Sequence, residues 1–147
     1  MKKEIVIALN KYLADTSVLY IKWHNLHWNV IGCQFKSVHE YLETLYDALA
    51  DNLDEIAELI KINNEVPLAS MKQYLEVTSI QELDSVEITV KEALNLVIKD
   101  MEDLKKSAVD LRIIADKEDA FDVVGMLEDN ISEYSKNIWF IKAMLKA

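Results

Sequence analysis

The side chains with the clearest metal-ligand chemistry lie between Trp23 and Glu58, a stretch that holds all three histidines of the chain. His39 and Glu43 are four residues apart, and so are Asp54 and Glu58. On a helix, a spacing of four places both members of a pair on one face, about one turn apart. Each pair could therefore share a metal ion.

The two pairs are too far apart to hold one ion within a single chain. His39 and Asp54 are 15 residues apart, which is roughly 22 Å along a helix that rises about 1.5 Å per residue. Ligand bonds of about 2 Å do not close such a gap. The pairs meet if a second copy of the helix lies antiparallel, with a two-fold axis near Ala48 and Leu49. This hypothesis gives two equivalent sites per dimer, each built from both chains.

Each of these residues also has a simpler interpretation when it is taken alone. A single histidine such as His27 or His39 is more often a hydrogen-bonded structural residue than a ligand. Glu43 belongs to a run of carboxylates at steps of four, which is typical of a solvated helix face. An ordinary intrachain di-iron bundle needs Glu three residues before a histidine, and none of the three histidines has one. His24 is interpreted as a structural residue or a weak accessory ligand.

The segment LHWNVIGCQFKSVHEYLETLYDALADNLDEIAE resembles the diagnostic segment of the Dps mini-ferritins, a family of iron-oxidising proteins. The residues that match the family's ferroxidase ligands one by one are His27, His39, Asp54 and Glu58. In this resemblance, Glu43 stands where the family has a supporting acidic residue, and Trp28 matches a tryptophan beside the iron site. The family builds that site across a two-fold subunit interface, in agreement with the spacing. The match in full register favours metal ligation over a structural role.

The resemblance continues through PLASMKQYLEVTSI and IWFIKAML, so it covers nearly the whole chain. Leu59 replaces an arginine that is usual in the family, and Asn63 and Asn64 replace a glycine pair, but no ligand is lost. Asp122 matches one of the aspartates that line a three-fold iron-entry pore in the family. Gly125 stands where another aspartate is common. The resemblance therefore supports the oxidation centre more strongly than the pore.

The resemblance implies a ferroxidase that oxidises two Fe²⁺ at each interfacial site, preferentially with hydrogen peroxide and more slowly with dioxygen. Fe³⁺ would then mineralise inside a hollow homododecamer, which protects against oxidative stress. Imidazole and carboxylate ligands suit Fe²⁺, carboxylates stabilise Fe³⁺, and the same ligands accept Zn²⁺ as a substitute. Trp28 is a candidate electron donor, with a packing role as the alternative. Two other functions stay open: a non-catalytic interaction protein, either DNA-associated or immune-stimulating, and a helical dimer with a structural metal site.

The formal net charge of −10 at pH 7 bears on the partners of the protein. DNA binding depends on Lys and Arg side chains that neutralise phosphates, and only Lys2 and Lys3 precede the first expected helix. We therefore predict no appreciable DNA binding and, for several assembled copies, a negative field that attracts Fe²⁺. With no apolar run of the roughly 20 residues that span a bilayer and no secretory signal, a cytoplasmic location is expected. Cys33, the only cysteine, is interpreted as a small buried apolar residue.

The scarcity of Gly and Pro, two and one respectively, favours long helices. Apolar residues at alternating steps of three and four predict helices over about residues 3–30, 35–63, 85–115 and 120–146. A short helix at SMKQYL, capped by Ser70, is predicted within the connection between the second and third of these. The expected fold class is all-α: one domain, residues 1–147, forming a ferritin-like four-helix bundle with a long crossover. Gly32 is expected to end the first helix, and Trp23 and Trp139 are assigned to the core.

Overall fold

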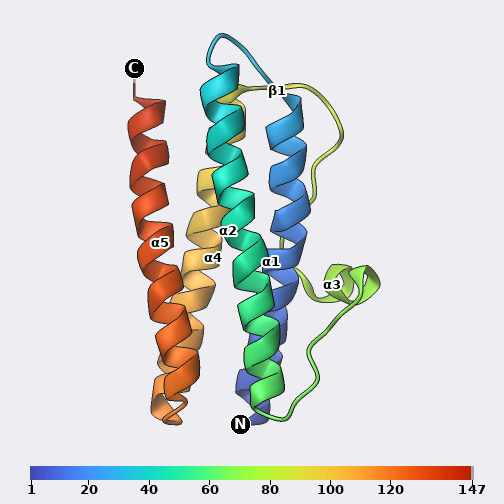
Figure 1. Ribbon diagram of the computed structural model, residues 1–147, viewed down its shortest axis with the longest axis vertical. Helices are drawn as coiled ribbons and strands as arrows, with labels where there is room; N and C mark the ends of the chain where they lie inside the picture. Colours follow the sequence, from blue (N-terminus) through green and yellow to red (C-terminus); the bar gives the residue numbers. More distant parts are fainter. Residues whose placement is uncertain (147) are drawn as a thin grey trace.

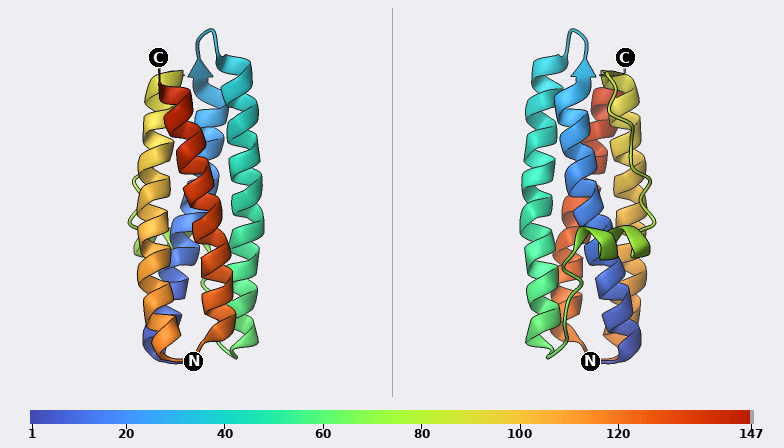
Figure 2. Two further views of the ribbon diagram at one scale, coloured as in Figure 1. Left: turned by 90° about the vertical axis from the view of Figure 1, so that its left-hand side faces the viewer. Right: turned by 90° about the vertical axis from the view of Figure 1, so that its right-hand side faces the viewer.

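The computed structural model describes residues 1–146 and shows four long helices that stand side by side (Figure 1). The long helices are α1 (Lys3–Asn29), α2 (Phe35–Ile62), α4 (Val90–Lys117) and α5 (Phe121–Leu145). Short connections make α1 antiparallel to α2 and α4 antiparallel to α5, whereas a long crossover joins α2 to α4 (Figure 2). This connectivity confirms the predicted ferritin-like bundle. None of the helices within residues 1–146 is long and apolar enough to cross a membrane.

The crossover runs back along α1 and is attached to it. Its short helix α3 (Met71–Val77) packs on α1 (Figure 2), and Ser70 caps this helix as predicted, because its side-chain oxygen accepts a hydrogen bond from the Gln73 amide at 3.3 Å. At the end of the crossover, strand β2 (Ile88–Thr89) pairs in parallel with strand β1 (Val30–Ile31), which directly follows α1. This pairing ties the crossover to the loop between α1 and α2, beside the candidate histidines.

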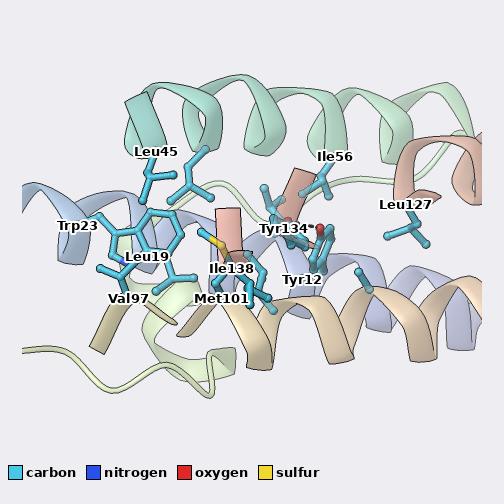
Figure 3. Close-up of a cluster of buried hydrophobic side chains, with 14 of the residues drawn as sticks. Tyr12, Leu19, Trp23, Leu45, Ile56, Val97, Met101, Leu127, Tyr134 and Ile138 are labelled. Atoms are coloured by element: carbon cyan, nitrogen blue, oxygen red, sulfur yellow. Dashed lines mark hydrogen bonds between the residues drawn. The ribbon is translucent and has the colours of Figure 1, made fainter. Parts of the chain in front are cut away.

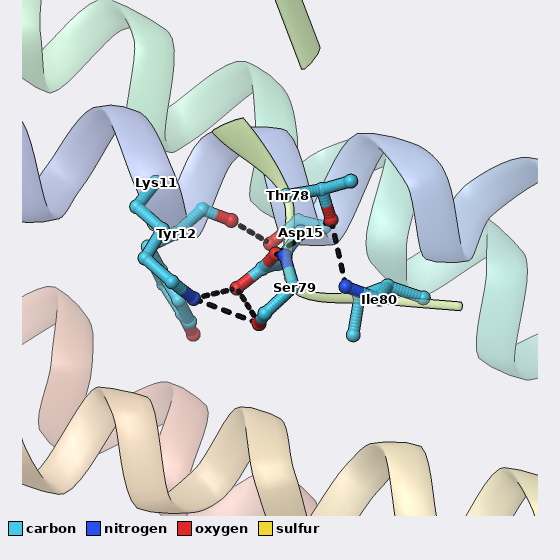
Figure 4. A network of polar contacts seen from close by, with 7 residues as sticks. Lys11, Tyr12, Asp15, Thr78, Ser79 and Ile80 are labelled. Atoms are coloured by element: carbon cyan, nitrogen blue, oxygen red, sulfur yellow. Dashed lines mark hydrogen bonds and ion pairs between the residues drawn. The ribbon is translucent and has the colours of Figure 1, made fainter. Parts of the chain in front are cut away.

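Asp15 fastens the middle of the crossover to α1 (Figure 4). Its buried carboxylate accepts hydrogen bonds from Thr78 Oγ1 at 2.7 Å and from the Ser79 amide at 2.9 Å. Lys11 Nζ lies 2.6 Å from the same carboxylate. A buried carboxylate is costly unless it is paired and hydrogen-bonded, so the network holds this part of the crossover in one position.

The apolar stripes of the four long helices face one another and form the core (Figure 3). Trp23 is buried there, as predicted. The core also contains a polar cluster: the hydroxyl groups of Tyr12 and Tyr134 share a hydrogen bond, and Asn130 Nδ2 donates to the Tyr12 hydroxyl at 3.0 Å. Burial raises the pKa of Tyr12 to about 12 and raises that of Tyr134 well above its usual value. Both phenols are therefore protonated at neutral pH.

A buried ion pair joins α1 to α4. Lys22 Nζ lies 2.9 Å from a carboxylate oxygen of Asp100, and both side chains are almost completely shielded from solvent. Burial raises the pKa of Asp100, and the hydrogen bond and charge of Lys22 oppose that shift. Pairing thus decides whether this carboxylate can stay ionised inside the bundle.

One predicted helix start and one predicted helix cap differ from the structure. The third long helix begins at Val90 rather than near residue 85, because Thr89 and Glu92 form a capping box with both hydrogen bonds at 3.3 Å. The first long helix ends at Asn29, before β1. Gly32 lies beyond that strand with φ +130° and shapes the turn into α2, so it does not cap α1.

Two predicted core positions are wrong. Trp139 is 66% exposed, because Ile138 and Ile141 take the inward positions of α5, and a residue next to an inward position is turned by about 100°. Cys33 is exposed, because it lies in the turn between β1 and α2 rather than on an inward helix face. Neither residue belongs to the bundle core.

Candidate metal centre

His27 and His39 come together across the loop that joins α1 to α2. Their rings stack with centroids 3.7 Å apart and planes 12° from parallel. His27 Nδ1 donates to the carbonyl oxygen of His39 at 2.6 Å, and His39 Nδ1 donates to the carbonyl oxygen of His27 at 2.7 Å. A carbonyl oxygen only accepts, so each Nδ1 carries a proton. In the neutral imidazole, each Nε2 then has a free lone pair, which is the form that binds a metal.

The local backbone explains how two residues twelve positions apart meet so closely. Val30 is buried and paired with Ile88, so the chain leaves α1 in a fixed direction. The turn at Gly32 then returns it to the start of α2, where the ring of Phe35 lies 4.9 Å from that of His39. The reciprocal hydrogen bonds therefore connect the last turn of α1 to the first turns of α2.

Glu43 lies one turn beyond His39 on α2 and is exposed. Its Oε1 accepts a hydrogen bond from the Tyr46 hydroxyl at 3.2 Å. The ring of Tyr46 stacks on His24 at 3.6 Å and meets His27 edge-on at 5.1 Å. Partial desolvation, with a further contribution from the hydrogen bond to Glu43, raises the pKa of the Tyr46 phenol, which therefore stays a donor at neutral pH.

Tyr46 and Tyr20 were not among the predicted site residues. Tyr46 follows Glu43 by three positions on a helix, so its place on the same face was readable from the spacing. Tyr20 lies one turn before His24, and its carbonyl oxygen accepts a hydrogen bond from His24 Nδ1 at 2.6 Å. A phenol is not among the histidine and carboxylate ligands that such a site favours, so neither tyrosine stood out in the sequence.

His24 and Trp28 extend this aromatic cluster towards the surface. The two rings are 5.3 Å apart and tilted by 52°, and Trp28 is 65% exposed. The structure gives His24 a packing position against Tyr46 and Tyr20, in line with the structural interpretation. The predicted role of Trp28 as an electron donor stays a prediction.

Asp54 and Glu58 do not join the histidines within one chain. Both are exposed on α2, which runs without interruption from Phe35 to Ile62. Because the helix is continuous, His39 and Asp54 are separated by roughly 22 Å along its axis. Within residues 1–146, no group of three His, Cys, Asp or Glu side chains lies close enough to hold a metal ion. A complete centre of the predicted composition needs a second copy of the chain.

Asp122 lies at the opposite end of the bundle. It is exposed in the first turn of α5 and accepts a hydrogen bond at 3.2 Å from Asn63, which follows α2. The two residues line a pocket of about 490 Å³ together with Glu118 and Asp119. A Cβ at Gly125 would meet nothing within 4 Å, so the missing aspartate is not explained by lack of space.

Comparisons with known proteins identify the family of the chain. The protein-family model of the ferritin-like domain matches residues 7–147 of the chain. DNA protection during starvation protein 2 from Bacillus anthracis is 40% identical to the chain over 99% of both sequences. The chain belongs to the Dps family of ferritin-like proteins.

Two solved structures, one of them of a Dps protein, are similar to this one over nearly their whole length. Antigen TpF1 from Treponema pallidum superimposes with a TM-score of 0.96 at 36% identity, covering 98% of this chain and 92% of that one. The Dps protein from Vibrio cholerae gives a TM-score of 0.93 at 27% identity, covering 98% and 90%. That protein is described as a member of a broad superfamily of ferritin-like diiron-carboxylate proteins.

Proposed function

We propose that this Dps protein oxidises and stores iron at ferroxidase centres that lie between subunits. One observation carries the proposal: the reciprocal hydrogen bonds of His27 and His39 use both Nδ1 atoms and leave both Nε2 lone pairs free. Two lone pairs held side by side form half of a metal site. The second half would be Asp54 and Glu58. Both are exposed on α2, the helix that carries His39, but they are too far along it to reach the histidines of their own chain.

The positions on α2 fit a two-fold axis. The midpoint between His39 and Glu58 coincides with the midpoint between Glu43 and Asp54, and both fall between Ala48 and Leu49. An antiparallel second copy centred there would set each histidine half-site opposite a carboxylate half-site. Leu49 is buried in the bundle, whereas Ala48 is exposed and small, which favours close approach of two helices.

The ligand chemistry supports oxidation of Fe²⁺ as the substrate. The imidazoles of His27 and His39 would bind Fe²⁺, and Asp54 and Glu58 of a second copy would stabilise Fe³⁺ as it forms, which favours electron loss. Two Fe²⁺ supply the two electrons that reduce hydrogen peroxide to two water molecules when two protons are added. Dioxygen would act more slowly, Trp28 would donate electrons when iron does not, and Zn²⁺ would compete for the same ligands.

Storage would follow oxidation. Fe³⁺ would mineralise inside a homododecameric shell, and Asp122 would line an entry pore for Fe²⁺. The net charge of −10 per chain supports attraction of the cation and argues against DNA as a partner. We place this activity in the cytoplasm, where Fe²⁺ is available and an exposed thiol such as Cys33 stays reduced. Removal of iron and peroxide together would protect the cell against oxidative stress.

A complementation experiment tests whether each site is built from two chains. His39→Ala and Asp54→Ala variants are co-expressed with different tags, and the mixed assemblies are purified. Each variant alone should oxidise Fe²⁺ no faster than buffer after anaerobic loading and addition of peroxide. Random mixing makes about half of the dimers mixed, each with one intact site of two, so about a quarter of the native activity should return.

The matched control mixes His39→Ala with His27→Ala. Both changes damage the same half-site, so no combination of these chains restores an intact centre and no activity should return. Recovery in the control, or none in the first mixture while the native protein is active, would contradict the interfacial site. If the native protein does not oxidise iron but binds Zn²⁺ tightly, the structural metal site is the better interpretation.

A further inference from the structure

The helix α2 begins and ends with an apolar side chain that the bundle leaves exposed. Its first residue, Phe35, is 40% exposed, and its last residue, Ile62, is 70% exposed. Phe35 lies four residues before His39, and Ile62 lies four residues after Glu58. A spacing of four keeps each apolar residue on the helix face of the neighbouring candidate ligand. Each half-site therefore continues outward into an apolar side chain.

The ring of Phe35 contacts one of the candidate ligands directly. Its centroid lies 4.9 Å from that of His39, and the two planes are tilted by 32°. His27 stacks on the same imidazole at 3.7 Å, and His39 Nδ1 donates to the carbonyl oxygen of His27 at 2.7 Å. Together these contacts restrain the ring of His39, whose Nε2 is the candidate ligand atom. The exposed part of Phe35 leaves room for a further apolar neighbour.

The proposed two-fold axis supplies this neighbour. The midpoint between Phe35 and Ile62 coincides with the midpoints of the two ligand pairs that the axis relates on α2. An antiparallel second copy would therefore set its Ile62 opposite Phe35, one turn beyond the ligands. Within one chain the two residues are about 40 Å apart along the helix axis. Only a second copy can bring them together.

We propose that Phe35 of one chain and Ile62 of a second copy close the outer end of each metal centre, with Phe35 as a positioning residue for His39. This inference rests on the proposed ferroxidase function and adds two residues that bind no metal. The apolar contact excludes water beside His39 and holds its ring when a metal ion binds. Since the hydrophobic shell around a metal site controls solvent access and the local dielectric, the contact raises the affinity of the centre.

Titration of the metal-free assembly with Co²⁺ tests the inference, because visible absorption reports binding without turnover. Phe35→Ala and Ile62→Ala should each weaken Co²⁺ binding about tenfold, whereas Phe35→Leu should recover most of the affinity because it keeps an apolar cover. Phe140→Ala is the matched control, since this phenylalanine of α5 is 36% exposed and its change should leave the native affinity. Light scattering verifies that each variant has the native assembly size.

Mixed assemblies test whether the two residues act across the interface. Phe35→Ala and Ile62→Ala chains are co-expressed with different tags. Random mixing makes about half of the dimers mixed, and each mixed dimer regains one centre with both apolar residues, so about a quarter of the centres should bind Co²⁺ with native affinity. If both residues acted within their own chain, no centre would regain that affinity.

The outcomes separate this inference from the function on which it rests. Native affinity in either alanine variant, or a mixture without native centres, overturns the apolar closure alone when the His39→Ala and Asp54→Ala mixture still restores iron oxidation. Absence of Co²⁺ binding by the native protein, or no restored oxidation in that mixture, overturns the interfacial centre and the apolar closure together.

Discussion

The interior of the bundle and the open face of α1 and α2, which carries the histidine pair and the exposed Glu43, Asp54 and Glu58, use polar side chains in opposite ways. In the interior, the hydroxyl groups of Tyr12 and Tyr134 bond to each other and to Asn130. On the open face, His27 and His39 bond to each other's backbone through one ring nitrogen and keep the other free. Both arrangements fix side chains in place, but only the second leaves lone pairs for a ligand.

The difference shows how one chain separates stability from chemistry. Buried polar groups are costly unless they are satisfied, so Tyr12, Tyr134 and Asn130 bond to one another and favour one packing of the helices. The buried His27 and the half-buried His39 instead satisfy one ring nitrogen each through the reciprocal hydrogen bonds and keep Nε2 available for the proposed metal ion. We therefore expect substitutions in the interior to change stability with little effect on ligand binding, and substitutions on the open face to do the reverse.

The largest loss of stability is expected for Lys22→Met. This change leaves Asp100 buried without its partner, and breaking a buried ion pair in this way costs about 3 to 5 kcal/mol. Burial already raises the pKa of Asp100, and removal of Lys22 raises it further. A carboxyl group with a raised pKa stabilises the fold below its unfolded pKa of about 3.9 and loses that contribution as pH rises through the folded pKa. The deficit in the free energy of unfolding should thus be larger at pH 7 than at pH 4.

Chemical denaturation of variant and native protein at equal concentration measures this deficit. The double variant Lys22→Met, Asp100→Leu is the control, because it removes the charge together with its partner and should recover most of the loss. A deficit that is the same at both pH values would mean that the carboxyl group of Asp100 is not the cause.

A smaller loss is expected for Tyr134→Phe. This change removes one hydroxyl from the buried cluster and should lower the free energy of unfolding by roughly 1 to 2 kcal/mol. Tyr41→Phe is a matched change at a half-buried tyrosine, whose hydroxyl donates to Asn137 at 2.8 Å. Water can replace that bond, so its loss should be smaller. Equal losses for the two variants would show that burial of the cluster has no special effect.

The smallest effect on stability is expected for the double variant Asp54→Asn, Glu58→Gln. Both side chains are exposed on the single chain, and surface substitutions of this kind change its free energy of unfolding by no more than about 0.5 kcal/mol. Metal binding should nevertheless be lost, as titration of the metal-free protein with Co²⁺ would show by its visible absorption. Unchanged Co²⁺ binding would remove these carboxylates from the site and contradict the interface model.

The sequence predicted the bundle well because its information is periodic. The stripe from Val38 to Ile60 on α2 is almost wholly buried, and the same periodicity predicted the other three long helices. The assignment of Trp139 to the core was wrong, because the inward positions of this part of α5 belong to Ile138 and Ile141. The predicted start of α4 was too early, because it followed the apolar pattern and not the capping box that Thr89 and Glu92 form.

The candidate site was predictable to the extent that its residues are local. The spacing of His39, Glu43, Asp54 and Glu58 on one helix is visible in the sequence, as is the conclusion that one chain cannot complete the site. The reciprocal bonds of His27 and His39 were not visible, because they depend on the turn between two helices. Asp15, Lys22 and Asp100 were also missed, because a buried charge is revealed only by a partner that lies far away in the sequence.

The uninterrupted course of α2 makes the number of residues between the two half-sites as important as their identity. Insertion of a single residue between Glu43 and Asp54 would rotate one half-site relative to the other by about 100° and shift it by about 1.5 Å. Every ligand would still be present, yet an antiparallel copy could no longer bring both centres together. If the centre spans two chains as proposed, the solvent-exposed residues among the ten intervening positions should tolerate many substitutions, but the segment should tolerate no change in length.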